Sequence, residues 1–221
     1  MPCTWADGPV RDTEGVTLTA VLSPSWTSSP AATPRVVLLH GFGSNERDLP
    51  SLAAWLPAHL PWASVRAPLE MGYGAAAWFP LDPSGAMDEH AITTATDALW
   101  DWIDAHVPDE APVIPVGFSQ GGLMALQLLR TRPARVLAPV VLAGFVGRDP
   151  QPADAELATS RPAVFWGRGD ADPVIWPDAI ARTQEFVDGH TTVTARLYPG
   201  LAHSVAQEEM DDVKAFLRAH I

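Results

Sequence analysis

A serine placed between two glycines is the first candidate for chemistry in this sequence. Gly117, Phe118, Ser119, Gln120 and Gly121 follow a short apolar stretch and precede a helical pattern. G-x-S-x-G at a strand-to-helix turn is typical of a nucleophilic serine, because glycine removes Cβ atoms that would clash where the backbone turns sharply. The free N–H groups at the start of the following helix favour a developing oxyanion. The alternative is a glycine-rich turn without chemistry.

A serine hydroxyl is a poor nucleophile without a general base, so an acid and a histidine are expected downstream. The stretch "GDADP" offers Asp170 and Asp172, and "YPGLAHSV" offers His203, each directly after an expected strand. We therefore predict Ser119, Asp172 and His203 as the catalytic residues. Asp170 competes with Asp172, and Pro173 favours the latter because it fixes the next φ and starts a turn.

The reaction also needs two N–H donors for the oxyanion, one of them from a loop after an early strand. The loop "LHGFGSN" at 39–45 meets this condition, and the backbone N–H groups of Phe42 and Gln120 are the predicted donors. A plain glycine turn is the alternative for this loop. His40 lies on the same side, whereas the other histidines lie on expected helices or at their ends, where solvated or capping roles are expected.

Alternating strands and helices position these residues. Apolar runs predict strands at 36–39, 62–68, 112–117, 135–144, 163–167 and 192–199. Helical patterns are found at 44–56, 88–107, 119–130, 177–189 and 205–220, with loops at 23–34 and 72–87. This alternation predicts an α/β fold in one domain, 1–221, with a mainly parallel sheet, helices on both faces and no lid domain. Ligands bind beyond the carboxyl ends of the strands in such sheets.

Composition excludes several classes of protein. With 14 basic against 26 acidic residues the net charge is −12, so nucleic acid is not an expected partner. The single cysteine, Cys3, excludes a disulfide scaffold, and no Cys or His cluster suggests a metal or cofactor. The N-terminus lacks the pattern of a signal peptide, and the longest apolar run, 136–146, is too short to span a membrane. These features predict a cytoplasmic protein without stable membrane insertion.

Taken together, these stretches resemble the α/β-hydrolase fold and, more narrowly, the phospholipase/carboxylesterase family of acyl-protein thioesterases and small bacterial carboxylesterases. The matching stretches follow in family order over 38–205: "LLHGFGSNERDL", "AWFPLD", "GFSQGG", "GDADPVI" and "YPGLAHSV". The resemblance implies Ser119 as nucleophile, Asp172 as acid and His203 as base, with the same two N–H donors. It also favours Asp172 over Asp170.

The acyl pocket is expected to draw on aromatic and apolar residues after the strands. Trp78 and Phe79 in the 72–87 loop, with Phe145 and Val146 after a later strand, are the predicted substrate-binding residues. The alternative for such an aromatic pair is burial in the core. Of the nine tryptophans, most are expected in the core, although some could line the site or a homodimer contact.

The predicted function is hydrolysis of small to medium apolar acyl esters through an acyl-enzyme. Phe42 and Ser44 stand where the family commonly has Leu and Asp, Pro80 replaces an Asp of the thioesterases, and Trp166 replaces part of a His-Gly pair. These departures favour small acyl groups. One alternative is a thioesterase or lysophospholipase of this family. A second is a perhydrolase or a dienelactone-type hydrolase, and a cysteine at position 119 would mark the dienelactone type. A third is a non-catalytic binding protein, which would normally require a broken triad.

Overall fold

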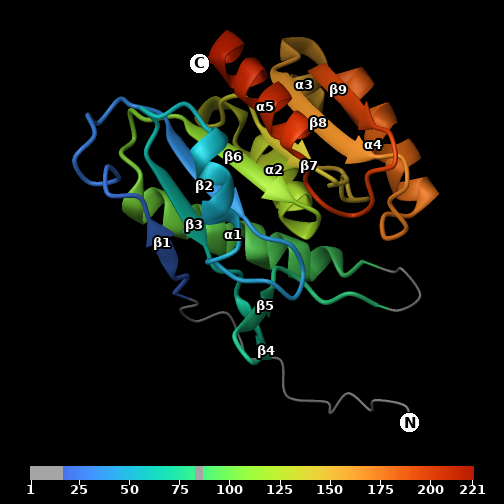
Figure 1. Cartoon of the computed structure of the whole chain (residues 1–221), viewed down its shortest axis with the longest axis horizontal. Helices are drawn as coiled ribbons and strands as arrows, with labels where there is room; N and C mark the ends of the chain where they lie inside the picture. The colour runs from blue at the N-terminus through green and yellow to red at the C-terminus, as the bar shows by residue number, and fades with distance from the viewer. Residues whose placement is uncertain (1–16, 83–86) are drawn as a thin grey trace.

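The computed structural model describes residues 17–82 and 87–221, and their centre is a seven-stranded sheet (Figure 1). Its strand order is β1-β3-β2-β6-β7-β8-β9, and every pairing is parallel except that of β1 with β3. The strands are β1 (Ala20–Leu22), β2 (Arg35–Leu39), β3 (Trp62–Val65), β6 (Val113–Phe118), β7 (Val140–Leu142), β8 (Ala163–Gly169) and β9 (Thr192–Tyr198). The predicted mainly parallel sheet is therefore present.

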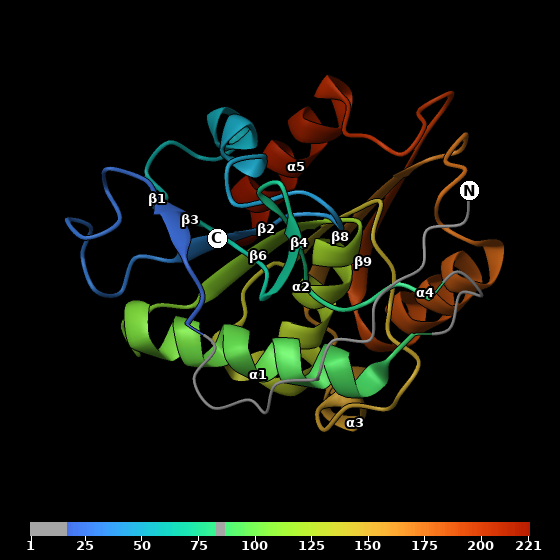
Figure 2. The same ribbon diagram turned by 90° about the horizontal axis from the view of Figure 1, so that it is seen from below.

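Helices cover both faces of this sheet, because successive strand residues point to opposite sides. On one face, Val37 and Leu39 pack with α1 and α2, whereas Val36 and Leu38 face α5 and the 3-10 helix η1 on the other. Figure 2 shows α5 on one side of the sheet and α1, α2 and α3 on the opposite side. The helices are η1 (Leu49–Trp55), α1 (Glu89–His106), α2 (Gln120–Thr131), η2 (Pro133–Arg135), α3 (Asp154–Ser160), α4 (Pro177–His190) and α5 (Gln207–His220).

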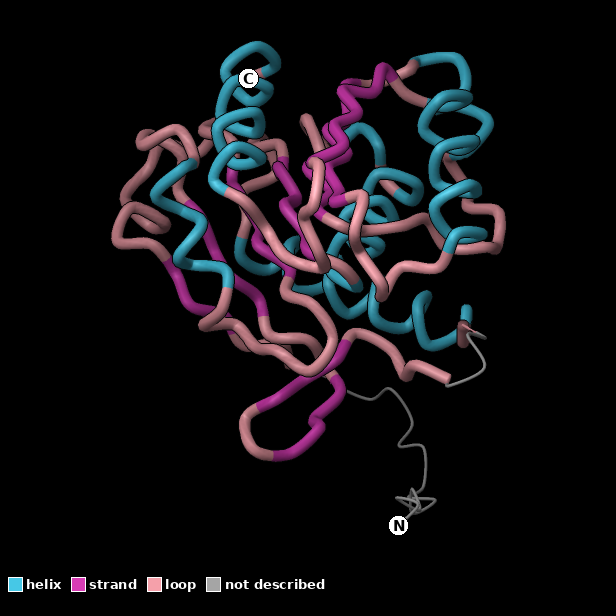
Figure 3. Tube along the Cα trace, turned by 45° about the vertical axis from the view of Figure 1, so that its right-hand side comes forward, coloured by secondary structure: helices cyan, strands magenta, loops and turns pink. Residues whose placement is uncertain are grey.

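The structure corrects two expectations near the site. The helix predicted over 44–56 is only the 3-10 helix η1, and Ser44 lies outside it because it pairs with Ala76 in an isolated bridge. The region predicted as an irregular loop, 72–87, begins as an antiparallel hairpin of β4 (Leu69–Gly72) and β5 (Ala75–Ala77). This hairpin projects from the body of the molecule (Figures 1 and 3).

Further differences lie after the site serine. The strand predicted over 135–144 is reduced to β7, because Ala138 adopts a left-handed φ of 45° and Pro139 has no N–H. The short helix α3 lies in a stretch for which no helix was predicted. Helix α4 continues one residue past Gly189, and the N–H of Thr191 ends it by bonding to Val187 O.

Some predictions concern residues outside the described part. These are the role of Cys3, the signal-free N-terminus and the parts of the 1–221 domain that fall in 1–16 and 83–86. Among the described residues, no helix is both long enough and apolar enough to cross a membrane.

Candidate active site

Ser119 lies in the turn between β6 and α2 and has a strained backbone, with φ 54° and ψ −116°. A Cβ on Gly117 would lie 2.0 Å from Gly121 O, and a Cβ on Gly121 would lie 1.9 Å from Leu39 O. Neither position has room for any side chain. The backbone contacts therefore require both glycines, for the steric reason expected from the sequence, and they fix the serine at the end of β6.

Ser119, His203 and Asp172 come together although they are far apart in the sequence. His203 Nε2 lies 2.9 Å from Ser119 Oγ, and His203 Nδ1 lies 2.7 Å from Asp172 Oδ2. The other carboxylate oxygen, Oδ1, accepts hydrogen bonds from the N–H groups of Val174 at 2.8 Å and Ile175 at 3.3 Å. The tautomer with a proton on Nδ1 fits both contacts of the imidazole, and it leaves Nε2 free to accept the serine proton.

The competing carboxylate, Asp170, has a different contact. Its Oδ1 accepts the N–H of Gly200 at 2.6 Å, in the turn that leads to His203. Nearby, the N–H of Ala171 bonds to Leu201 O at 3.1 Å, which holds the same turn against the end of β8. The structure thus places Asp172 at the histidine, whereas Asp170 holds the loop that carries it.

The imidazole of His203 is also positioned by an aromatic neighbour. The ring centroids of Phe118 and His203 are 4.9 Å apart, with the planes tilted by 43°. The side chains of His203 and Asp172 are 17% and 4% exposed, so their contact is largely shielded from water. This packing restricts rotation of the imidazole away from the serine.

The two predicted N–H donors belong to residues of the pocket that contains Ser119. Phe42 and Gln120 line the same pocket as the serine. Within the described residues, neither of their N–H groups has a hydrogen-bond partner, whereas those of Gly122 and Leu123 bond to Ser119 O. Gln120 is the first residue of α2, where an unpaired N–H is expected. The arrangement leaves two N–H groups able to bind an oxyanion.

His40 supports the loop that carries Phe42. Its ring is buried, with Nδ1 2.8 Å from Gly41 O, and its Nε2 lies 3.0 Å from the N–H of Ala67. A neutral ring with the proton on Nδ1 donates to the former and accepts from the latter. Burial lowers the pKa of His40, and the hydrogen bond to Gly41 O only partly offsets this effect. The neutral side chain of His40 therefore holds the loop through these two hydrogen bonds.

Trp78, Phe79 and Val146 do not line the pocket, which corrects the prediction that they contact substrate. All three are buried in the core cluster between the sheet and α1 and α2. The side-chain amide of Gln120 accepts the N–H of Trp78 at 2.8 Å and donates to Phe79 O at 2.7 Å. These bonds turn the backbone so that both aromatic rings point inward. Of the four predicted residues, Phe145 does line the pocket.

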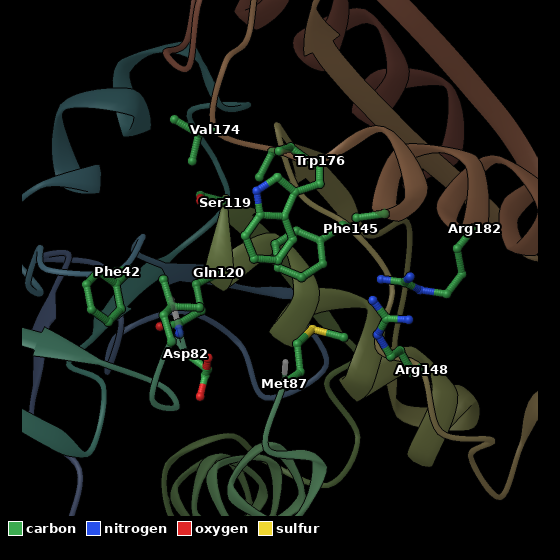
Figure 4. A pocket seen from close by; sticks show the side chains of 13 residues that line it. Phe42, Asp82, Met87, Ser119, Gln120, Phe145, Arg148, Val174, Trp176 and Arg182 are labelled. Carbon is green, nitrogen blue, oxygen red and sulfur yellow. The ribbon is translucent and has the colours of Figure 1, made fainter. Parts of the chain in front are cut away.

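The pocket beside Ser119 has a volume of about 390 Å³ and is mainly apolar (Figure 4). This volume is in the range of small-molecule sites. Its apolar side chains include Phe42, Leu81, Met87, Phe145, Val174 and Trp176. Val174 and Trp176 were not predicted as pocket residues. Their position could have indicated this role, because they are large apolar residues in the loop that follows Asp172.

No group of three or more His, Cys, Asp or Glu side chains among the described residues is arranged to hold a metal ion. Ser119 instead contacts a histidine that contacts a carboxylate, and two residues whose N–H groups are unpaired within the described part of the chain line the same pocket. Such a set can transfer a proton and stabilise an oxyanion, which is the chemistry of acyl transfer.

Comparison with known proteins identifies the family of this chain. A family model described as Phospholipase/Carboxylesterase matches residues 25–221. The chain belongs to this family. The acyl-protein thioesterase 1 of Mycosarcoma maydis is 30% identical to it over 236 residues, which cover 90% of this chain and 95% of that protein.

Solved structures of esterases share the fold. The structure of esterase PE8 has a TM-score of 0.72 and 26% identity and covers 93% of this chain and 100% of its own. The carboxylesterase of Bacillus cereus has a TM-score of 0.73 and 21% identity, with coverage of 91% and 94%. This phospholipase/carboxylesterase family member therefore has the predicted α/β-hydrolase fold, and it is a serine hydrolase.

Proposed function

We propose that the protein hydrolyses carboxylic esters through an acyl-enzyme on Ser119, with His203 as general base and Asp172 as the residue that orients it. The continuous contact from Ser119 Oγ to His203 Nε2 and from Nδ1 to Asp172 Oδ2 is the observation that carries this proposal. A binding protein on this fold would have no need to keep all three groups in contact.

Each step of the proposed reaction uses a group that lies in or beside the pocket. His203 Nε2 takes the hydroxyl proton while Ser119 Oγ attacks the carbonyl carbon. The oxyanion is held by the N–H groups of Phe42 and Gln120, and one such donor typically contributes about 3 kcal/mol. The imidazolium returns the proton to the leaving alcohol, and a water molecule activated by His203 then releases the acid.

The size and lining of the pocket support the proposal that the substrate has a small to medium acyl group. Its volume of about 390 Å³ and its apolar wall fit a short hydrocarbon chain. A thioester is the second candidate substrate, because the relative from Mycosarcoma maydis is named an acyl-protein thioesterase. A series of matched oxygen and thiol esters from acetate to laurate separates the two, and a maximum at laurate would contradict the short-chain proposal.

The nucleophile is tested with p-nitrophenyl acetate. We predict that Ser119→Ala lowers kcat by at least about 10⁴-fold, because no other group can carry the acyl chain. The matched control is Ser204→Ala, next to His203 but exposed, which should stay near wild type. An organophosphate should label Ser119, as located by mass spectrometry.

Two outcomes would refute this assignment. One is activity near wild type in Ser119→Ala, and the other is an adduct on a different residue. A wild type that neither turns over the ester nor takes the label would favour the binding protein instead. Three statements stay predictions from the sequence: the single domain, the possible homodimer and the cytoplasmic location.

A further inference from the structure

Two arginines line the same pocket as Ser119. Arg148 lies in the loop after β7, and Arg182 lies in the second turn of α4. Apart from Asp82, which also lines the pocket, the other described residues of the lining are uncharged. A lining with two basic residues and one acidic residue is unusual in a chain with 14 basic against 26 acidic residues. Two of the three charged residues in this described lining are therefore basic, and Asp178 lies against both of them.

The two guanidinium groups share one carboxylate. Arg148 Nη2 donates to Asp178 Oδ2 at 3.0 Å, and Arg182 Nη1 lies 3.6 Å from the same oxygen. Arg182 Nε also donates to Val146 O at 3.2 Å. Each guanidinium carries five N–H donors in a planar fork, so these contacts use only a part of their capacity. The remaining donors are available to an oxygen ligand.

Burial and neighbouring charges act on this pair in opposite directions. The pKa of Arg182 is lowered, first by burial and then by the positive charge of Arg148, whereas Asp178 and Glu89 raise it. Arginine stays protonated nonetheless, so two like charges lie beside an apolar cavity. Asp178 partly offsets both charges, and so does Glu89 on α1. The Oε1 of Glu89 accepts the N–H of Arg148 at 2.9 Å, and its charge acts on Arg182. That carboxylate holds the Arg148 backbone, whereas the guanidinium groups face the pocket.

Figure 4 shows how this end of the pocket relates to the serine. The guanidinium groups of Arg148 and Arg182 point toward each other, and in this view Phe145 and Trp176 lie between them and Ser119. The pocket therefore offers, in one cavity, a nucleophile, an apolar wall and a pair of forked cations. An apolar wall fits methylene groups, and a fork of two or more N–H donors fits the planar oxygens of a carboxylate.

We propose that the substrate is an ester that also carries a carboxylate, and that Arg148 and Arg182 bind this carboxylate while Phe145 and Trp176 cover the chain that joins it to the ester. The proposal rests on the proposed ester hydrolysis at Ser119. Hydrolysis then gives an alcohol and a dicarboxylic acid if the carboxylate lies on the acyl side. It gives a hydroxy acid and a monocarboxylic acid if the carboxylate lies on the alcohol side.

The test compares acidic and neutral esters of equal length. For the acyl side, kcat/KM is measured with mono-p-nitrophenyl succinate, glutarate and adipate and with the matched butyrate, valerate and caproate esters. For the alcohol side, acetate esters of ω-hydroxy acids are compared with those of plain alcohols. We expect the wild type to favour the acidic ester at one particular length, because the distance from Ser119 to the arginines is fixed.

The readout for the arginines is the ratio of acidic to neutral kcat/KM. Arg148→Gln and Arg182→Gln should each lower this ratio by about 10- to 100-fold, the effect of losing a charged hydrogen bond. Arg182→Lys keeps the charge and should keep part of the preference, which a purely structural role would not produce. The control is Arg132→Gln, whose partner is Asp104 on the surface and which should leave the ratio unchanged.

The outcomes separate this inference from the proposed function. If the neutral esters are hydrolysed and no series shows an arginine-dependent preference for the acidic ester, the carboxylate site is overturned and the esterase proposal stands. If the wild type hydrolyses neither kind of ester, both are overturned. A ratio that is equal in the wild type and in the Arg148→Gln/Arg182→Gln double variant also overturns the carboxylate site.

Discussion

Asp170 and Asp172 are separated by one residue, yet their carboxylates do different work. Asp172 Oδ2 contacts His203 and its Oδ1 accepts two backbone N–H groups, which fix the carboxylate in place. Asp170 instead bonds the N–H of Gly200. Variants of the two residues can therefore be compared directly, because Asp172 contacts the imidazole and Asp170 contacts the loop that carries it.

We predict that Asp172→Asn lowers kcat for p-nitrophenyl acetate by about 10⁴-fold, because an amide cannot hold the imidazole in the required tautomer. Asp170→Asn should stay within about tenfold of wild type and lose at most about 1 kcal/mol of unfolding free energy, because the amide oxygen can still accept the N–H of Gly200 but carries no charge. Steady-state kinetics and urea unfolding measure the two effects. Equal losses of kcat in both variants would contradict this division of roles.

Single residues also show what the sequence can and cannot predict. The proximity of Ser119, Asp172 and His203 could be predicted because each follows a strand and the residue types suit one reaction. The burial of Trp78 was not readable. It is accompanied by a hydrogen bond from the Trp78 N–H to Gln120, 42 positions away, and the same aromatic sequence suits a pocket wall or a core.

At the level of elements, the turn between β6 and α2 is fixed by backbone contact with a neighbouring strand. The missing Cβ of Gly121 leaves room for Leu39 O at the end of β2, so β2, β6 and α2 must pack closely for the turn to form. The G-x-S-x-G pattern revealed this turn from sequence. The reduction of 44–56 to η1 was not visible, since it depends on the bridge between Ser44 and Ala76.

We predict that Gly121→Ala lowers the unfolding free energy by at least about 3 kcal/mol and abolishes activity, because its Cβ would overlap Leu39 O. Gly189→Ala is the control. No atom lies within 4 Å of a Cβ added at Gly189, and alanine in α4 should raise the unfolding free energy by up to about 1 kcal/mol. Urea unfolding of both variants is the measurement. A Gly121→Ala protein as stable as wild type would contradict the close packing at this turn.

At the scale of the whole molecule, the alternation of apolar runs predicted a mainly parallel sheet with its reactive groups at one edge. The strand order could not be predicted from the sequence. Parallel strands are joined by long connections, so no short stretch of sequence indicates which strands pair. The packing of α5 on β8 is another such long-range result. It buries Glu209 against Gly167, where a Cβ would lie 2.2 Å from Glu209 Oε1.

The buried Glu209 makes the stability of the whole fold depend on pH. Burial, aided by the negative charge of Asp212, raises the pKa of Glu209 to about 7, and the backbone of Ala206 offsets only a part of this shift. In the unfolded chain the carboxyl group has its ordinary pKa, near 4.5. The folded state therefore holds a proton that the unfolded state loses, and stability falls as the pH rises from about 4.5 through about 7.

We predict that Glu209→Gln removes this dependence, because the amide stays neutral at every pH. Relative to wild type, the unfolding free energy of the variant should rise with pH and level off above pH 7, where the gain is on the order of 3 kcal/mol. Urea unfolding at pH 5, 6, 7 and 8 measures it, with Glu208→Gln, exposed on the same turn, as the control. Parallel curves for wild type and Glu209→Gln would show that burial of this carboxyl group does not set the pH dependence. A difference that grows between pH 5 and 7 only in Glu209→Gln would place the titrating group in the contact between α5 and β8.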